Sequence, residues 1–417
     1  MKLALLAALP VSLATISACS GQTPDGTMEE RPSSPEPQKD ASAGTGPKAD
    51  DAPKTDDAAA KVDAPKTDEA PALFGGSIER VMAKLPTKGQ AAQTPWSGST
   101  WPASTDSINH RWDDRSSPAA TEKYETAFRA SDVQHHVSAS HGLEGGGASC
   151  LWNSMCGEDI CGRRNDSTLG RCVSRRANIE PGWASAAILV PEPQHEVVEN
   201  GVTFKETDIK ALASMLYTKS ERETVSLHCN EDESALNRDK HTRSAAKCRH
   251  TNPGTLHLLL ANYLGIRKQA FVENRPFYDR VSNRPVRGYQ IQEQRVVSDE
   301  EANRLVLGDA SSPIPTSYAF NSGAKSFLYV KTRVAYVRES NAGEVFYSAD
   351  AYTTHDEFTY ILELDGKGAI IGGEWVGASK NVHADSLWLP KPVTSGHVAG
   401  ISYNQVKKLV DASIANP

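Results

Sequence analysis

The amino-acid sequence predicts an α+β protein with a disulfide-bearing region ahead of its core, on three observations. Several segments before residue 270 carry apolar residues at helical spacing. The last third of the chain alternates apolar and polar residues, as half-buried strands do. Most of the cysteines cluster in a chain that begins with an export signal, and disulfide bonds form in such a compartment.

The length and the net charge of the chain limit the number of domains and the kinds of partner that it can have. The chain has 417 residues, enough for two or three domains once its ends are removed. Its formal net charge is −7, and most of the acidic excess lies in an N-terminal tail. A chain of this charge is not expected to bind nucleic acid as its main partner.

The N-terminus has the pattern of an export signal. Lys2 precedes an apolar run over residues 3–16, and Ser17-Ala18-Cys19 resembles the bacterial lipobox, in which the cysteine receives the lipid. We therefore predict a signal peptide over 1–18 and an exported lipoprotein anchored through Cys19. Ser20 after the cysteine favours the outer membrane, at the cell surface or in the periplasm. The alternative is ordinary cleavage, with Cys19 removed or left free.

Residues 19–72 are rich in Pro, Ala, Asp and Lys and nearly lack large apolar residues, and the motif Asp-Ala-Pro-Lys-Thr-Asp occurs at 51–56 and again at 63–68. Such a segment cannot bury a core, so we predict a disordered tether. A tail that binds a partner is the alternative.

The cysteines that remain after Cys19 are even in number, which predicts three disulfides and no spare thiol. They are Cys150, Cys156, Cys161, Cys172, Cys229 and Cys248. The first four predict a small disulfide knot, and the last two are expected to close the polar loop between them. A zinc site is the alternative for the knot, but paired C-x-x-C knuckles are missing.

The elements before residue 270 follow from apolar periodicity and capping residues. We expect short helices over 77–85 and 119–129, a strand over 202–204, a helix capped by Thr207, and a strand over 225–229. Asn252-Pro-Gly-Thr255 opens an apolar segment over 256–264, whose pattern does not distinguish a buried helix from a strand. His135, His136 and His141 are expected in a solvated loop, with metal binding as the alternative.

The last third predicts strands and two capped helices. We expect a strand over 327–337 and a hairpin of 359–364 with 369–376 around Asp365-Gly366. Two capping boxes, Ser298 with Glu301 and Ser402 with Gln405, are expected to open helices.

The stretch Asn178–Pro193 has the pattern of a helix that could carry a nucleophile. We expect Pro181-Gly182 to form a turn, the small residues after it to start a buried helix, and Pro191 to end it. A helix N-terminus lowers the pKa of a thiol placed there. The position that would carry the thiol holds Glu180.

The segment Val281-Ser-Asn-Arg-Pro-Val-Arg-Gly-Tyr289 matches the pattern V-W-N-Q-P-V-R-G-F/Y, with Ser282 in place of Trp and Arg284 in place of Gln. This pattern is the elicitor segment of the transglutaminase elicitors of oomycetes and their bacterial relatives, and the chain therefore resembles that family. Further matching blocks follow the family order; they are 186–193, Cys248 with 252–257, 362–365 and 371–375.

The resemblance implies a secreted protein-glutamine γ-glutamyltransferase, an aminoacyltransferase that is calcium-dependent in the oomycete members, with a core similar to papain-like cysteine proteases. It implies three parts: a helical and disulfide-bearing region over 73–175, the elicitor-like core over 176–300 and a β-rich part over 301–417. The chemistry needs a thiolate, a His base and a group that orients the His. We see no acidic loop with calcium-ligand spacing, so no metal ligands are assigned.

The family pattern assigns the site residue by residue. Trp183 and the small residues after it put Glu180 in the slot of the nucleophilic cysteine, His257 is the implied base, and Asn274 is the implied orienting group. His257 as an ordinary buried histidine is the alternative, and His383 with Asp385 forms a weaker second constellation. The candidate binding residues are Trp183, Asn283, Pro285, Arg287 and Gly288.

A carboxylate is a poor nucleophile for an amide, because the mixed anhydride that it would form is high in energy. We therefore favour a relative without ordinary transglutaminase activity that binds a protein ligand. The alternatives are an active enzyme that joins Gln to Lys with a different nucleophile, and a carboxylate hydrolase that uses Glu180. We expect the segment Val281–Tyr289 to be partly exposed, with Arg287 either paired with an acidic partner or in solvent.

Overall fold

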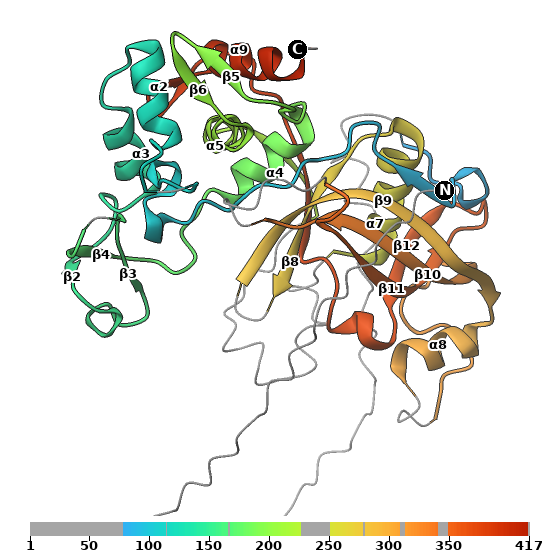
Figure 1. Ribbon diagram of the computed structural model, residues 1–417. Coiled ribbons are helices and arrows are strands. Elements are labelled where there is room, and N and C mark those ends of the chain that lie inside the picture. Colours follow the sequence, from blue (N-terminus) through green and yellow to red (C-terminus); the bar gives the residue numbers. More distant parts are fainter. Residues whose placement is uncertain are drawn as a thin grey trace, which may run out of the picture. The chain divides into compact units, whose positions relative to one another are not determined.

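The computed structural model describes residues 78–113, 115–165, 167–226, 251–277, 280–308, 313–340 and 349–415. All of them belong to one compact unit, Ala59–Pro417. They form helices and strands in separate groups (Figure 1), which confirms the α+β class. Among these residues, no helix combines the length and the apolar character that crossing a membrane requires.

An antiparallel sheet of eight strands forms the larger group. The strands follow the order β12-β11-β10-β9-β8-β13-β7, and β1 pairs with β9 beside this path. The strands are β1 (Lys88–Gln90), β7 (Arg222–Ser226), β8 (Phe271–Phe277), β9 (Arg280–Val297), β10 (Ser326–Val337), β11 (Thr353–Leu364), β12 (Ile370–Trp375) and β13 (Ser386–Pro390). The long strand β9 pairs with β8 through its first half and with β10 through its second half. The register of the β9–β10 pair shifts twice, and such bulges bend and twist a sheet.

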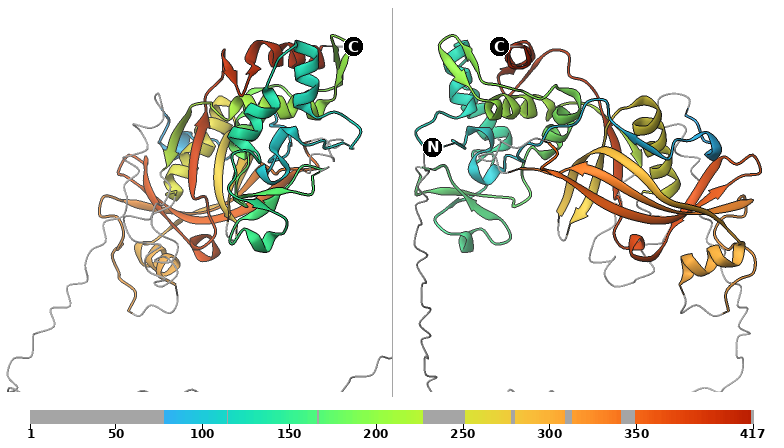
Figure 2. Two further views of the ribbon diagram at one scale, coloured as in Figure 1. Left: turned by 90° about the vertical axis from the view of Figure 1, so that its left-hand side faces the viewer. Right: turned by 45° about the vertical axis from the view of Figure 1, so that its right-hand side comes forward.

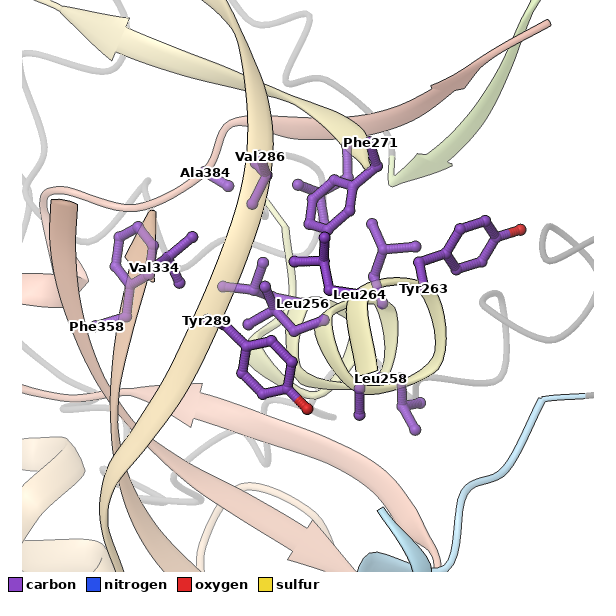
Figure 3. Packing of buried hydrophobic residues seen from close by; sticks show 14 of the residues in the cluster. Leu256, Leu258, Tyr263, Leu264, Phe271, Val286, Tyr289, Val334, Phe358 and Ala384 are labelled. Atoms are coloured by element: carbon purple, nitrogen blue, oxygen red, sulfur yellow. The ribbon is translucent and has the colours of Figure 1, made fainter. Parts of the chain in front are cut away.

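One face of the sheet is covered by α7 (Pro253–Leu259) and by the π-helix η7 (Leu260–Arg267) that continues it. Figure 3 shows Leu256 and Leu264 of these helices with Phe271, Val286 and Val334 of the sheet, all in one buried cluster. The segment 256–264, which the sequence left open, is therefore helical. Its apolar residues point in most directions because it is buried nearly all round.

The opposite face receives α4 (Glu180–Leu189). Ala184 of α4 packs with Val272 of β8 and Trp388 of β13. Val272 follows Phe271 directly, and successive side chains of a strand point to opposite faces. The helices α4 and α7 therefore lie on opposite sides of β8.

The second group is helical, and in Figure 2 its green and cyan helices gather apart from the sheet. It contains α2 (Ala120–Phe128), α3 (Val133–His141), α5 (Glu206–Tyr217) and α9 (Tyr403–Ile414), with the two-stranded pairs β5 (Val197–Glu199) with β6 (Val202–Phe204) and β14 (His397–Val398) with β15 (Ile401–Ser402). Its core holds Trp96, Trp101 and Trp183, all fully buried. The C-terminal helix α9 packs on α5, about 190 residues earlier in the chain.

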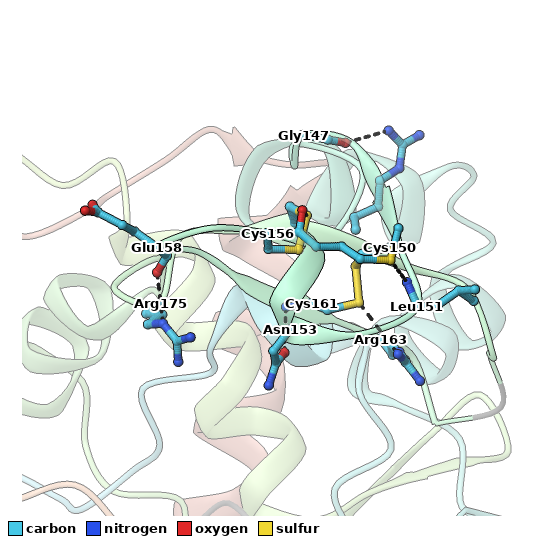
Figure 4. Close-up of a disulfide and its surroundings, with 12 residues drawn as sticks. Gly147, Cys150, Leu151, Asn153, Cys156, Glu158, Cys161, Arg163 and Arg175 are labelled. Carbon is cyan, nitrogen blue, oxygen red and sulfur yellow. Dashed lines mark hydrogen bonds between the residues drawn. A yellow bond between two sulfur atoms is a disulfide. The ribbon is translucent and has the colours of Figure 1, made fainter. Parts of the chain in front are cut away.

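A small three-stranded sheet, β2 (Ser149–Cys150), β4 (Gly170–Val173) and β3 (Ile160–Gly162), forms a disulfide knot. Disulfides join Cys150 to Cys161 and Cys156 to Cys172 (Figure 4), which confirms the predicted knot. The zinc alternative is wrong, because these sulfurs are bonded to one another. Cys229 and Cys248 lie outside the described residues, as do Cys19, the signal peptide and the predicted tether.

The remaining short elements are α8 (Asp299–Leu307) and the 3₁₀ turns η2 (Met82–Lys84), η3 (Ala103–Thr105), η4 (Ser107–Asn109), η5 (Asn153–Met155) and η8 (Gly377–Lys380). The predicted helix over 119–129, the strands over 202–204 and 327–337 and the hairpin are confirmed. The strand predicted over 225–229 is β7, which begins earlier, at Arg222, and is described only to Ser226.

Several local predictions are wrong. The helix over 77–85 is only the single turn η2, because Val81 forms a β-bridge with Ala369 and the backbone is extended at Val81 and Leu85 on either side of the turn. Thr207 lies inside α5 rather than capping it, since Asp208 accepts the backbone N–H of Lys205 at 2.8 Å. The histidines predicted in a loop belong to α3.

The helix predicted after Ser402 is confirmed as α9, with Ser402 as its N-cap residue. Its capping box is not formed, because the Ser402 side chain makes no cap hydrogen bond and Gln405 accepts a hydrogen bond from the Tyr124 hydroxyl. Of the other box, Ser298 accepts the N–H of Glu301 at 3.2 Å, as predicted.

Candidate functional site

The helix α4 begins at Glu180, four residues before the small-residue run that starts at Ala184. Asn178 accepts the backbone N–H of Glu180 at 3.0 Å, and Pro181 fits the first helical turn, where its missing N–H is not needed. The predicted turn at Pro181-Gly182 is therefore wrong. Gly182 serves close packing instead: a Cβ added there would lie 2.4 Å from the carbonyl oxygen of Ser214 on α5.

Glu180 is buried against β9. The Ser282 hydroxyl donates to Oε1 of Glu180 at 2.8 Å, and the Asn283 amide donates to Oε2 at 3.5 Å. Burial raises the pKa of the Glu180 carboxyl, the hydrogen bond from Ser282 lowers it, and the negative charge of Glu339 raises it. The two stretches that the sequence singled out, the start of α4 and the elicitor-like segment, thus meet at this carboxylate.

Asn274 lies next to this contact but serves another side chain. It is the cross-strand partner of Asn283, and its Oδ1 accepts the indole N–H of Trp388 at 3.3 Å. The backbone carbonyl of Asn274 accepts the N–H of Asp385 at 2.8 Å. Asn274 therefore fixes β13 beside β8, and its described hydrogen bonds do not include His257.

His257 lies on the other side of the sheet from Glu180. It belongs to α7, is buried, and its Nδ1 is 2.9 Å from the Tyr360 hydroxyl, which is 2.7 Å from Thr332 Oγ1. Its Nε2 has no hydrogen-bond partner among the described residues. Burial lowers the pKa of His257 to about 4, so the ring is neutral at neutral pH. The structure does not bring the implied base to the implied nucleophile slot.

The two residues of the second constellation each have other contacts within the described chain. The His383 ring stacks on Trp375 with centroids 4.7 Å apart, and its Nδ1 is 2.6 Å from the carbonyl oxygen of Ser379. Asp385 is buried, and its backbone bonds Asn274 and Thr251.

The candidate binding residues differ in their surroundings. Trp183 is fully buried in the helical core, and Pro285 is buried opposite Val272. Arg287 donates to Asp350 Oδ1 at 2.6 Å and to Thr353 Oγ1 at 2.8 Å, so it pairs with an acidic partner. The segment Val281–Tyr289 is mostly buried where its side chains are described, because it forms a central strand, and the prediction of partial exposure is wrong for most of it.

Arg287, Gly288 and Tyr289 line a cavity of about 410 Å³ on the sheet surface. Gly288 and its neighbour Ala335 on β10 have little or no side chain, so they leave the centre of this surface low. Arg333 and His355 stand at its sides, and Arg333 makes no ion pair within the described chain. Burial lowers the pKa of His355, and the charges of Arg333 and Arg287 lower it further. We call this site the arginine groove.

The sequence reasoning missed both Arg333 and His355, because each is an ordinary polar residue in an alternating strand. It also missed Glu273 of β8, which is fully buried beside its cross-strand partner Arg284. Neither carboxylate oxygen of Glu273 has a hydrogen-bond partner among the described residues. Burial raises the pKa of Glu273 to about 7, although the charges of Arg275 and Arg284 lower it. The available signal was its position directly after the apolar pair Phe271-Val272 at the start of a strand.

Calcium does not fit the side chains that the structure describes. Their one group of three or more metal-ligating side chains is Cys150, Cys156 and Cys161, whose sulfurs are in disulfides. Calcium prefers oxygen ligands, and the described side chains contain no group of three or more carboxylates close enough to share an ion.

Comparisons with known proteins agree with this fold. The family model described as "Transglutaminase elicitor" matches residues 68–416. The crystal structure of the GP42 transglutaminase from Phytophthora sojae is similar to this chain at 32% identity and a TM-score of 0.71, and the match covers 85% of this chain and all of GP42. No curated protein matches the chain. The chain belongs to the transglutaminase elicitor family.

Proposed function

We propose that this chain has lost ordinary transglutaminase activity and acts as a surface-anchored module that binds a protein ligand. The observation that carries the proposal is the environment of Glu180. A buried carboxylate held by Ser282 and Asn283 takes the slot where the family pattern places the thiol. Such a group cannot form a stable acyl intermediate with a glutamine side chain.

A second feature supports the loss of activity. No described histidine is hydrogen-bonded to Glu180, and the implied base His257 packs on the opposite face of the sheet. A thiol nucleophile needs a base within hydrogen-bond reach. The start of α4 against β8 and β9 supports the predicted papain-like arrangement, which stays part of this proposal, but its reacting groups are not assembled.

The cysteines support the same conclusion. All four that the structure describes are in disulfides. Ser226 and Thr251, on either side of segment 227–250, share a hydrogen bond of 2.7 Å. Cys229 follows Ser226 by three residues and Cys248 precedes Thr251 by three (229 − 226 and 251 − 248). Three residues span at most about 10 Å, so each cysteine lies within that reach of the hydrogen-bonded pair Ser226 and Thr251. This proximity supports the predicted Cys229–Cys248 disulfide.

The arginine groove supports a binding role. Arg287 is already paired with Asp350, which also lines the groove, so Arg333 is the guanidinium left to bind a ligand. It lies with His355 beside the low centre at Gly288 and Ala335, and this combination favours an extended peptide that carries a carboxylate.

We expect an Asp/Glu-rich peptide to bind by fluorescence anisotropy, and Arg333→Gln to weaken binding about tenfold. Lys331→Gln is the matched control, because Lys331 lies on the same strand and is already paired with Glu357 at 2.8 Å.

Amine incorporation tests the loss of activity. A labelled primary amine and a glutamine-donor protein are incubated with the chain, with and without calcium, and we expect incorporation at the level of the blank in both. Incorporation that survives Glu180→Ala would contradict the placement of the slot. Its loss in Cys229→Ser or Cys248→Ser would then establish the alternative, an active enzyme that crosslinks Gln to Lys.

The anchor is tested separately. The proposed lipoprotein should incorporate a labelled fatty acid in cells, and Cys19→Ser should abolish this labelling. A wild-type chain that carries no label, or a Cys19→Ser chain that is still labelled, would contradict the lipid anchor.

A further inference from the structure

The disulfide knot exposes an unusual amount of apolar side chain. Leu151 is 44% exposed, Trp152 67%, Met155 55% and Leu169 56%. Large apolar residues exposed singly are common, but a contiguous group marks a surface that binds something. None of these residues belongs to the Glu180 site or to the arginine groove.

The four side chains form one group, which we call the knot tip. The β2–β4 ladder pairs Ser149 with Arg171 and Cys150 with Gly170, so Leu151 and Leu169 follow at the same end of the two strands. The backbone N–H of Leu151 donates to Met155 Sδ at 3.2 Å, and Trp152 follows directly. The two disulfides hold the strands and the intervening loop together, so little conformational entropy remains to be lost on binding.

The knot carries three arginines without carboxylate partners among the described residues, and one of them, Arg163, lies beside the knot tip. The Arg163 guanidinium lies 5.8 Å from the centre of the Trp152 ring, and Figure 4 shows it beside Cys161. Arg171 donates to the carbonyl oxygen of Gly147 at 3.1 Å, and Arg175 donates to that of Glu158 at 2.9 Å. Within the described chain, none of these three makes an ion pair. The hydrogen bonds of these arginines go to carbonyl oxygens or to sulfur, so each guanidinium keeps its positive charge, although Arg175 lies beside the acidic pair Glu158-Asp159.

We propose that the knot tip docks on an anionic lipid surface. Tryptophan favours the headgroup level of a bilayer, leucine and methionine enter the acyl boundary, and an arginine beside them contacts headgroup phosphates. Four side chains are too few for a stable protein interface, which takes about 800 Å² from each partner. A bilayer instead accepts a small apolar tip whose binding an arginine beside it strengthens.

The chain has a built-in probe for this contact. Trp152 is the one exposed tryptophan of the seven, because the other six are buried or partly buried. We use the chain from Ser20 onward, which lacks the lipid-bearing Cys19 and keeps the whole compact unit. Vesicles of phosphatidylcholine with phosphatidylglycerol should bind it, shift its fluorescence to the blue and quench it when the acyl chains are brominated. Pure phosphatidylcholine should bind at least tenfold more weakly, and added salt should weaken the binding to anionic vesicles.

Variants separate the apolar and cationic contributions. Trp152→Ala should abolish the quenching and weaken vesicle binding about tenfold. Arg163→Gln removes the one arginine that lies over Trp152 and should weaken binding to anionic vesicles about fivefold. Val198→Ala is the matched control, because Val198 is 65% exposed outside the knot and should leave binding unchanged.

All these side chains except Val198 lie on the knot, so each variant is first shown to have no free thiol, which establishes that both disulfides formed. The proposal is overturned by a wild-type chain that does not bind anionic vesicles, or by binding that Trp152→Ala leaves intact. A knot tip that binds only a soluble protein would overturn it as well.

Discussion

Glu180 has a structural role as a hydrogen-bond acceptor, whether or not its position once held a nucleophile. It joins the first turn of α4 to β9 through Ser282 and Asn283, so one buried carboxylate connects the helix to the sheet. Removing an acceptor from buried donors costs their full desolvation, which exceeds the net value of the hydrogen bonds themselves.

Glu180→Ala should therefore lower the free energy of unfolding by about 2–3 kcal/mol, the cost of unsatisfied donors plus a small cavity. Denaturant unfolding near pH 6 measures it. Ser282→Ala should cost less, about 1 kcal/mol, and a double-mutant cycle should give a coupling of about 1 kcal/mol between the two residues. Additive effects would show that the Ser282–Glu180 hydrogen bond contributes nothing.

Glu273 gives the stability of the protein a pH dependence. Its folded-state pKa is raised to about 7, above its ordinary value, so the folded chain keeps this proton where the unfolded chain has lost it. For such a group the free energy of unfolding falls as the pH rises from about 4.5 to above 7. The charges of Arg275 and Arg284 beside it limit this loss.

Glu273→Gln should remove that dependence. Glutamine resembles the protonated form, so the variant should match the wild type at pH 5 and be more stable than it by about 2–3 kcal/mol at pH 8. Denaturant midpoints at the two pH values check this. A variant that is equally destabilised at both would show instead that the carboxylate is held ionised by its arginines.

At the scale of elements, the sequence predicted those with a clear local cause. Strand β10 alternates regularly, and the β11–β12 hairpin has its Asp-Gly turn, so both were found. The start of α4 was misplaced because Pro181-Gly182 has a turn composition, whereas the contact of Gly182 with α5 depends on the fold. Long-range packing also explains why Val281–Tyr289, whose polar residues predicted partial exposure, forms part of the central strand β9.

The N-cap of α7 is an element whose contribution can be measured. The Asn252 side chain accepts the N–H of Gly254 at 2.8 Å and donates to the carbonyl oxygen of Gly373 on β12 at 3.1 Å. Asn252→Ala should cost about 1–2 kcal/mol of unfolding free energy. Ser402→Ala, at an N-cap without a side-chain hydrogen bond, should cost less than about 0.5 kcal/mol. Equal losses would contradict the assigned cap.

At the scale of the whole molecule, residues far apart in the sequence decide the candidate site. The family pattern assigned Glu180, His257 and Asn274 from their order along the chain, but order does not state on which face of a sheet a helix packs. The opposed faces of β8 separate Glu180 from His257. The same topology joins Glu180 to Ser282, a contact across about 100 residues that no local pattern could reveal.

The thiol count tests how this molecule differs from an enzyme that acts through a cysteine. The mature chain without Cys19, denatured and not reduced, should show no free thiol, because the two knot disulfides account for four cysteines and the proposed Cys229–Cys248 bond for the other two. Full reduction should release six thiols and confirm the count. Two free thiols before reduction would contradict the third disulfide and make Cys229 and Cys248 the candidates for a nucleophile. In that case the Cys229→Ser and Cys248→Ser chains, compared in the amine incorporation assay, would identify which of them reacts.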